Sequence, residues 1–337
     1  MPDSNTAIDL NGKTVLVTGG TGSFGRQFST TLLDRYKLRK LIILSRDEHK
    51  QYDMQQESAF AGREELRYFI GDVRDVDRLR MAMRDVDCVV HAAALKHVPA
   101  AEYNPFECIR TNVYGAENVI SAAIDCGVER VIALSTDKAV NPINIYGASK
   151  LASDKLFVAA NTLAGNSPTR FSVVRYGNVL GSRGSIVPLI RRLVAEGCDS
   201  IPLTDDRMTR FWITLEQGID FVLSSAAIMK GGEIFVPKVP SMTVIDMMEA
   251  LAPGVPRDII GIRPGEKLHE LLISEDDTAA VAERNGRYVI CPSQDENVQA
   301  QHEAEGATVI PAGFQYASNT NDEWLDADGL VRLLASI

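Results

Sequence analysis

The sequence lacks any apolar run long enough to cross a membrane. A membrane-spanning helix needs roughly 20 consecutive apolar residues, and no stretch of the 337-residue chain approaches that length. The N-terminal stretch Met1–Asn5 also lacks the basic and apolar regions of a secretory signal. We therefore expect a soluble, cytoplasmic protein that does not associate with membranes.

Cysteine is scarce and shows no recognisable spacing. The chain has five cysteines, which form no CxxC pair and no metal-ligand pattern. We interpret them as reduced residues, most of them in the core, and we expect no metal site. These residues are Cys88, Cys108, Cys126, Cys198 and Cys291.

An excess of positive charge is missing as well. The formal net charge is -10, which argues against a nucleic-acid partner, because such a partner requires a basic stripe. A small anionic substrate remains compatible, since a few arginines and helix N-termini are enough to hold phosphates. The hydrophobic content of 45% and charged content of 24% are typical of a globular enzyme.

Short apolar runs alternate with helical patterns through the first half of the chain. This alternation predicts a Rossmann-like α/β fold, a doubly wound parallel sheet with right-handed connections. We expect an NADP-binding domain over residues 1–176, to which later segments return, and a smaller, mainly substrate-binding C-terminal domain over 177–337. The predicted strands are 14–18, 40–44, 66–70, 87–91, 131–134 and 171–175.

A glycine turn follows the first of these strands. Gly19, Gly22 and Gly25 lie at Gly-x-x-Gly-x-x-Gly spacing, and a helix is predicted to continue to about Tyr36. Glycines at this point let the backbone approach a pyrophosphate at the N-terminus of a helix. Strand, turn and helix in this order therefore predict a dinucleotide cofactor, although a plain tight turn is the alternative.

The residues after the second strand bear on the choice of cofactor. Ser45 and Arg46 suit a 2′-phosphate, which favours NADP over NAD. Asp47 would repel that phosphate if it pointed inward, and it is the fallback ligand of an unmodified ribose. Asp72 and Val73 suit the adenine ring, while an acid at this point is also a candidate cap for the helix from Val76.

Small residues after the fourth strand leave room for the cofactor's ribose. The residues predicted to contact the cofactor are Gly19, Thr21, Gly22, Ser23, Phe24, Gly25, Ser45, Arg46, Asp47, Lys50, Asp72, Val73, Ala92, Ala93, Ala94, Tyr146, Lys150 and Val179.

The central stretch carries the candidate catalytic residues. Thr136, Asp137 and Lys138 follow a buried strand, and chemistry in an open α/β sheet lies beyond the carboxyl ends of its strands. Tyr146 and Lys150 are four residues apart on one face of a helix that Asn144 is expected to cap. A nearby lysine favours the phenolate, so we expect a lowered pKa for Tyr146 and a role as base.

The second half of the chain supplies candidate substrate ligands. Arginines in loops near glycine and proline suit bidentate phosphate binding, although each alone is also compatible with a surface ion pair. The candidates are Lys96, Asn178, Ser182, Arg183, Arg210, Arg263 and Glu266. We also expect a helix from about Pro105 to Cys126, in which Asn112 bonds a neighbouring backbone. Thr214 and Thr243 are expected to cap helices ending at Ile228 and Leu251. The tail over 276–320 is expected to be irregular apart from one strand near Tyr288–Cys291, and a closing helix is expected over 324–337.

These stretches together resemble the extended short-chain dehydrogenase/reductase superfamily. Within it, the chain is similar to the inverting UDP-N-acetylglucosamine 4,6-dehydratases of pseudaminic acid biosynthesis. The motifs that carry the resemblance are Thr136-Asp-Lys138, Tyr146 with Lys150, Ala93-Ala-Leu-Lys-His-Val98, Arg175-Tyr-Gly-Asn178 and Arg263-Pro-Gly-Glu-Lys267. In the related dTDP-glucose 4,6-dehydratases the triplet is Thr-Asp-Glu, so Lys138 points to the inverting branch.

The resemblance implies an intramolecular redox reaction on a UDP-sugar by a homo-oligomeric lyase. Tyr146 would deprotonate the 4-hydroxyl, with Thr136 bonding near it and Lys150 holding the cofactor's ribose. Lys138 would take the carbon-5 proton, and Asp137 would protonate the departing 6-hydroxyl. Burial would favour the neutral forms of both residues and a salt bridge between them would oppose this, and the sequence leaves the two environments open.

Three other functions remain compatible with parts of this pattern. A retaining nucleotide-sugar dehydratase and a UDP-sugar 4-epimerase share the tyrosine, the lysine and the cofactor. An epimerase has no need of Asp137 and Lys138. A non-catalytic NADP-binding scaffold conflicts with the intact Thr136, Tyr146 and Lys150.

Overall fold

The computed structural model describes residues 8–181, 185–277, 281–293 and 295–335. Within these ranges the main sheet has ten strands in the order β16-β14-β15-β10-β6-β5-β4-β1-β2-β3. The predicted α/β fold with a doubly wound parallel sheet is confirmed.

Apolar runs form the parallel part of the sheet because helices cover both faces and bury them. Val15, Leu16 and Val17 of the first strand are fully buried. All the predicted strands are present, each within one residue of its expected start. The parallel strands are β1 (Thr14–Thr18), β2 (Lys40–Ser45), β3 (Leu66–Ile70), β4 (Cys88–His91), β5 (Arg130–Thr136), β6 (Arg170–Tyr176) and β10 (Ile234–Pro237).

Helices α1 and α9 contact each other, and α6 contacts both α3 and α7, so the helices fall into two groups around the sheet. Thr214 caps α9 with a capping box, and Thr243 caps α10, as predicted. The helices associated with the main sheet are α1 (Ser23–Arg35), α2 (Glu48–Gln56), α3 (Val76–Ala82), α4 (Val98–Tyr103), α5 (Pro105–Ile109), α6 (Gly115–Cys126), α7 (Ile145–Leu163), α9 (Leu215–Ile228) and α11 (Glu296–Ala304).

Several predicted segments differ from the structure. The helix expected from Pro105 to Cys126 is interrupted by a π-helical turn, η1 (Arg110–Tyr114), which separates α5 from α6. The tail over 276–320 is more regular than expected, because it adds three antiparallel strands to the edge of the sheet. These strands are β14 (Val281–Arg284), β15 (Arg287–Ile290) and β16 (Thr308–Val309).

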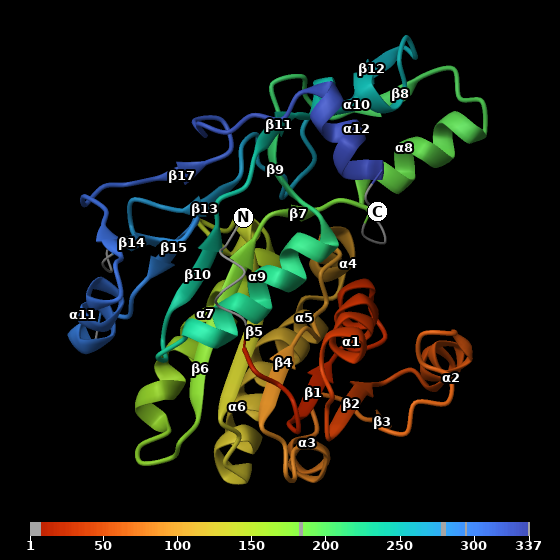
Figure 1. Ribbon diagram of the computed structural model, residues 1–337. Coiled ribbons are helices and arrows are strands. Elements are labelled where there is room, and N and C mark those ends of the chain that lie inside the picture. Colours follow the sequence, from red (N-terminus) through yellow and green to blue (C-terminus); the bar gives the residue numbers. More distant parts are fainter. Residues whose placement is uncertain (1–7, 182–184, 278–280, 294, 336–337) are drawn as a thin grey trace.

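A smaller group of elements lies at the top of the view in Figure 1 and has its own apolar core. Trp212, Met247 and Leu330 are buried in that core. The closing helix is shorter than predicted within the described residues. This group and its neighbouring segments contain β7 (Asn178–Val179), α8 (Ile186–Ala195), β8 (Ile201–Leu203), β9 (Thr209–Ile213), β11 (Ser241–Thr243), α10 (Val244–Leu251), β12 (Arg257–Ile259), β13 (Leu271–Ile273), β17 (Tyr316–Ala317) and α12 (Ala327–Ala335).

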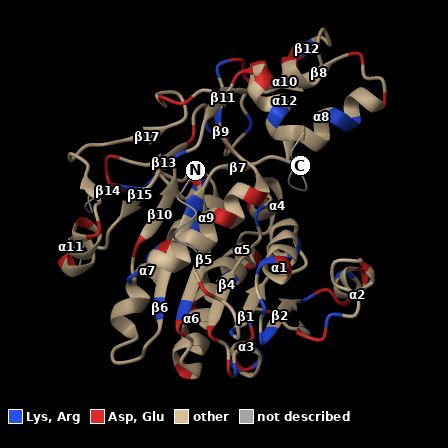
Figure 2. Ribbon diagram, in the orientation of Figure 1, with Lys and Arg blue, Asp and Glu red and all other residues tan. Residues whose placement is uncertain are grey.

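Acidic and basic residues are interspersed along the chain in the view of Figure 2. No helix among the described residues combines the length and the apolar character that a membrane crossing requires.

Candidate active site

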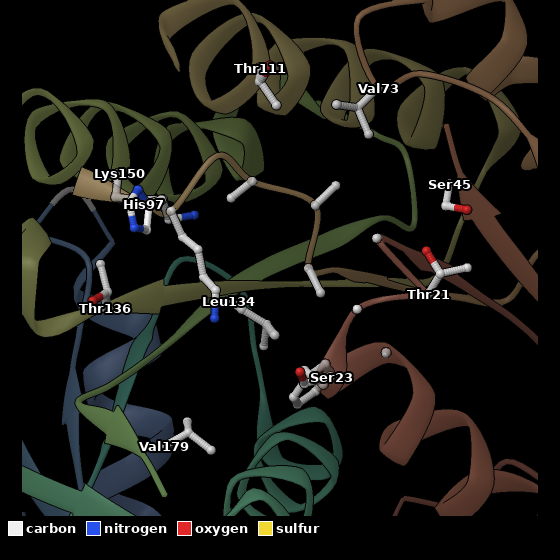
Figure 3. Close-up of a pocket in the computed structure, with 18 of the residues that line it drawn as sticks. Thr21, Ser23, Ser45, Val73, His97, Thr111, Leu134, Thr136, Lys150 and Val179 are labelled. Carbon is white, nitrogen blue, oxygen red and sulfur yellow. The ribbon is translucent and has the colours of Figure 1, made fainter. Parts of the chain in front are cut away.

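A cleft of about 580 Å³ runs along the carboxyl ends of the parallel strands. Every residue that the sequence predicted for the cofactor lines it, from the glycine turn to Val179. Figure 3 shows Thr21, Ser23 and Ser45 toward one end, and Thr136, His97 and Lys150 toward the other. The cleft is therefore long enough to bring the glycine turn and the central stretch into one site.

The glycine turn fits a pyrophosphate. Gly19 adopts a φ of 66°, and a Cβ atom there would lie 2.9 Å from the Ala93 backbone. Gly22 precedes α1 and provides no side chain to cap it. The first amides of α1 therefore face the cleft without a capping side chain, which is the arrangement that binds phosphate at a helix N-terminus.

The end of β2 places one cation at the cleft. Asp47 caps α2 by accepting a hydrogen bond from the Lys50 amide at 3.1 Å, and it also pairs with the Lys50 ammonium at 3.0 Å. These bonds lower the pKa of the Asp47 carboxyl. Arg46 lies 3.7 Å from Asp72 in a partly exposed ion pair, a kind of pair that contributes little to stability.

The adenine-side acid does not cap the helix that follows it. Asp75 caps α3 by accepting from the Arg78 amide at 2.9 Å. Asp72 instead accepts two hydrogen bonds from the Arg74 guanidinium. Burial on its own would raise the pKa of Asp72, but these bonds lower it.

Buried polar side chains fix the loop after β4. Asn112, on the π-helical turn, exchanges two hydrogen bonds with the backbone of Leu95, at 2.8 and 2.9 Å, and donates a third to Ser149 Oγ. The predicted supporting role of Asn112 is confirmed by these bonds. They connect the loop to α7, the helix of the candidate catalytic pair.

Helix α7 packs against the central stretch at very short range. Asn144 caps α7 as predicted, accepting from the Gly147 amide at 2.7 Å. A Cβ atom at Gly147 would lie 2.1 Å from the carbonyl oxygen of Lys138, in the short 3₁₀ turn η2 (Asp137–Ala139). Only glycine permits this approach, which places Tyr146 and Lys150 beside Thr136 and Lys138 in one cleft.

The expected lowering of the Tyr146 pKa is wrong for this structure. Burial raises the pKa of Tyr146 to about 12, and the Lys138 charge and a hydrogen bond with Thr136 oppose that rise only in part. Burial also lowers the pKa of Lys150, against the opposing charge of Asp154. Desolvation of the buried phenol, which no spacing in the sequence reveals, outweighs the favourable charge of a nearby lysine.

Asp137 and Lys138 form the salt bridge that the sequence had left as one of two alternatives. The Lys138 Nζ lies 3.0 Å from Asp137 Oδ1. Burial would lower the pKa of Lys138, but the charges of Asp137 and Glu270 outweigh it and raise the pKa. Asp137 is fully buried, accepts a hydrogen bond from Thr136 Oγ1 at 2.8 Å, and has no partner for Oδ2 among the described residues.

The candidate substrate ligands that the structure describes separate into three groups. Lys96 and Asn178 line the cleft. Arg210 is not among the residues that line it and donates to the carbonyl oxygens of Thr209, Lys267 and Leu268, which favours a supporting role over phosphate binding. Arg263 and Glu266 lie 3.8 Å apart in a loop that does not line the cleft, and Ser182 and Arg183 lie outside the described residues.

Sequence reasoning missed several residues that the fold brings to the site. Glu270 is buried 3.9 Å from the Lys138 ammonium. Lys267 donates to the carbonyl oxygen of Val140. Asp154, one turn beyond Lys150, accepts from Ser135 Oγ at 2.7 Å. The spacing of Asp154 from Lys150 was visible in the sequence, whereas no local pattern connects Glu270 to Lys138.

The described residues contain no cluster of histidine, cysteine and carboxylate side chains that would hold a metal ion.

Sequence comparisons point to nucleotide-sugar enzymes. The family profile described as "Polysaccharide biosynthesis protein" matches residues 15–292. A UDP-N-acetylglucosamine 4,6-dehydratase (inverting) of Campylobacter jejuni is 55% identical over 96% of this chain and 98% of its own length. A UDP-glucose 4-epimerase of Rickettsia akari is 40% identical over 96% of both chains.

Solved structures share the fold. The X-ray structure of Pen from Bacillus thuringiensis has a TM-score of 0.88 and 35% identity, covering 98% of this chain and 99% of that one. DesIV, a dTDP-glucose 4,6-dehydratase of Streptomyces venezuelae solved with NAD and TYD bound, has a TM-score of 0.67 and 25% identity. That match covers 76% of this chain and 86% of DesIV.

Proposed function

The chain belongs to the family of polysaccharide biosynthesis proteins, and from this premise we propose that it is an inverting UDP-N-acetylglucosamine 4,6-dehydratase. The similarity to the Campylobacter jejuni enzyme over nearly the whole of both chains supports this activity. The product is a UDP-2-acetamido-2,6-dideoxy-hexos-4-ulose, and the reaction is the loss of water from the sugar.

The observation that carries the proposal is the proximity of an acid–amine pair to the tyrosine–lysine pair. Asp137 and Lys138 lie 3.0 Å apart directly after β5, and Lys138 lines the same cleft as Tyr146 and Lys150. Oxidation at carbon 4 needs only the tyrosine–lysine pair. The additional acid and amine supply what elimination needs, a proton acceptor at carbon 5 and a proton donor at the 6-hydroxyl.

The cleft residues fit a nicotinamide dinucleotide, with the glycine turn at its pyrophosphate. That group, when bound, supplies the reversible hydride acceptor that links carbon 4 to carbon 6. Tyr146 accepts the proton of the 4-hydroxyl, and the neighbouring Thr136 and Lys138 favour its phenolate. Lys150 adds a buried ammonium beside the reacting groups, and Asp154 favours its charged form.

The salt bridge between Asp137 and Lys138 corresponds to the state after elimination. Before that step Lys138 must be neutral and Asp137 protonated. This state forms from the ion pair when one proton moves from Lys138 Nζ to Asp137 Oδ1 along their 3.0 Å contact. Taking the carbon-5 proton and giving one to the departing 6-hydroxyl restores the ion pair. The total number of protons on the pair is the same before and after.

We assign NADP as the cofactor, because Arg46 is the available cation at the end of β2 while Asp47 is already engaged by Lys50. Lys96 and Asn178, and the undescribed Ser182 and Arg183, are assigned to the UDP-sugar, and Arg263 and Glu266 are assigned to it as residues of an adjacent loop. We further assign the substrate-binding part mainly to residues 177–337, from which β10, β14, β15 and β16 return to the main sheet, and we propose a cytoplasmic homo-oligomer.

An isotope experiment tests the function. Wild-type protein is incubated with UDP-N-acetylglucosamine carrying deuterium at carbon 4, and the product is followed by NMR. The deuterium should appear on the new 6-methyl group, and in a separate incubation in D₂O solvent deuterium should enter carbon 5. The Asp137→Asn variant should build up reduced cofactor with little 6-deoxy product, a loss of about 10²–10⁴-fold in elimination.

The same experiment tests the epimerase alternative that the Rickettsia akari relative raises. An epimerase returns the deuterium to carbon 4 and forms no methyl group. That result, or an Asp137→Asn variant within a few-fold of wild type, would contradict the proposal.

A further inference from the structure

Glu270 is a buried carboxylate aimed at the acid–amine pair. It lies just before β13, is 2% exposed, and places Oε1 3.9 Å from Lys138 Nζ and 3.7 Å from Arg210 Nε. Ser318 holds the Glu270 backbone through two hydrogen bonds. The Glu270 amide donates to the Ser318 hydroxyl at 2.9 Å, and the Ser318 amide donates to the Glu270 carbonyl at 2.9 Å. The position of the side chain is therefore set by the fold.

The Glu270 side chain differs from a carboxylate that serves structure alone. Its Oε2 has no hydrogen-bond partner in the described part of the chain, and Oε1 makes only the two longer ionic contacts. Glu233, also fully buried, shows the contrast, because it accepts hydrogen bonds from Ser172 Oγ at 2.6 Å and from the Gly231 amide at 2.8 Å. Burying a carboxylate without such hydrogen bonds costs free energy. For Glu270, the ionic contacts with Lys138 and Arg210 offset this cost.

The charged groups around Glu270 come from three segments. Asp137 and Lys138 face it from η2, Arg210 from β9, and Lys267 from its own loop. Burial raises the pKa of Glu270 above its ordinary value and Asp137 raises it further, while the positive charges of Lys138, Arg210 and Lys267 offset this rise only in part. Hydrogen bonds to backbone carbonyls hold the Arg210 side chain in place. Among the cations around Glu270, Lys138 is the one that gains a proton in the proposed reaction.

We propose that Glu270 is a positioning residue for elimination: its carboxylate holds Lys138 Nζ and stabilises the ammonium that forms when Lys138 takes the carbon-5 proton. This inference rests on the proposed function. In the step, the electron pair of the C5–H bond becomes the C5–C6 double bond, and the C6–O bond breaks. Asp137 gives its proton to the leaving oxygen, water departs, and the positive charge remains on Lys138 between two carboxylates.

The test is the pH dependence of carbon-5 deprotonation in Glu270→Gln. Solvent deuterium incorporation at carbon 5 is measured in wild type and variant across a pH series. A charge about 4 Å away shifts a pKa by about 1–3 units. Removing the Glu270 charge should therefore lower the pKa of Lys138. The limb of the profile at high pH, where the Asp137–Lys138 pair loses its shared proton, should then move to lower pH by about one unit or more. The rate on the plateau should fall roughly 3- to 30-fold, because a base with a lower pKa removes the carbon-5 proton more slowly.

Two further variants separate this role from a structural one. Glu270→Asp keeps the charge but moves it away by one methylene, so its limb should lie between those of wild type and Glu270→Gln. Glu233→Gln is the matched control, because it removes a buried carboxylate outside the cluster. It should lower the melting temperature and leave the limb in place.

The outcomes are distinct from those of the functional test. If wild type forms no 6-deoxy product, the proposed function fails and this inference fails with it. If wild type is active and folded Glu270→Gln has the wild-type limb, only this inference is overturned. Should Glu270→Gln not fold, the comparison of Glu270→Asp with wild type decides, and coincident limbs overturn it.

Discussion

A single buried imidazole at the end of β4 makes the stability of the protein depend on pH. His91 is 2% exposed, and its Nδ1 lies 2.9 Å from Thr18 Oγ1, which in turn accepts from the Ala92 and Ala93 amides. Burial, with a smaller effect of the Lys150 charge, lowers the pKa of His91 to about 3. The folded state therefore keeps this imidazole neutral at a pH where an unfolded chain protonates it.

The sign of the resulting pH dependence follows from that difference. Between about pH 6.5 and pH 3 the unfolded chain binds the proton and the folded chain does not, so the free energy of unfolding falls as the pH falls. The slope from this residue reaches about 1.4 kcal/mol per pH unit. We expect His91→Asn to flatten the pH dependence in this window, although packing loss lowers its stability at neutral pH.

Urea unfolding at a series of pH values measures this effect. The comparison is the difference between variant and wild type, so that the titration of carboxylates below about pH 5 cancels. Parallel curves for the two proteins from pH 6.5 to pH 5 would contradict the assignment of this slope to His91.

The choice between NADP and NAD also belongs to one residue. Arg46→Glu replaces the proposed partner of the 2′-phosphate with a like charge, so we expect NADP binding to weaken by at least about 10-fold relative to NAD. Dissociation constants for both cofactors are measured by calorimetry. Arg84→Glu is the matched control, since it makes the same change of charge at an exposed position that does not line the cleft; equal losses in both variants would refute the specific contact.

At the scale of the element, the site depends on how closely α7 approaches η2. Gly147→Ala places a methyl group against the Lys138 carbonyl oxygen, so the helix must move away. We expect a loss of about 1–3 kcal/mol in stability and a fall in turnover of about 100-fold, because a displacement of about 1 Å at a catalytic group costs that much.

Gly218→Ala is the control for this prediction. Gly218 lies in α9, and a Cβ atom there meets nothing within 4 Å. The substitution should stabilise the helix by up to about 1 kcal/mol and leave turnover unchanged. Turnover and thermal unfolding are measured on both variants, and a fully active Gly147→Ala would show that α7 tolerates the displacement.

The elements that sequence analysis missed had signals of different strength. Asn285 and Gly286 both have positive φ and join β14 to β15, and an Asn-Gly pair between apolar runs is a strong hairpin signal. That hairpin was predictable and was overlooked. The π-helical turn at 110–114 was not, because it depends on Asn112 reaching the backbone of Leu95 in a different loop.

At the scale of the whole molecule, the sequence predicted what periodicity determines and missed what long-range packing determines. The first six parallel strands and the glycine turn are local patterns, and the starts of these strands were predicted within one residue, whereas the parallel strand β10 was not predicted. The ionic contact between Lys138 and Glu270 joins segments far apart in the chain, so no spacing rule could predict it. Desolvation of Tyr146 is likewise a property of the assembled core.

The loop over 263–270 is hydrogen-bonded to residues 137–144, which include Asp137 and Lys138. Asn144 donates to the Gly265 carbonyl at 2.8 Å, and Lys267 donates to the Val140 carbonyl. A chimaera that joined residues 1–176 of this protein to the C-terminal half of a relative would separate these partners. To build an enzyme with new sugar specificity, residues 137–144 and 263–270 would have to be exchanged together, so that both segments come from the same protein.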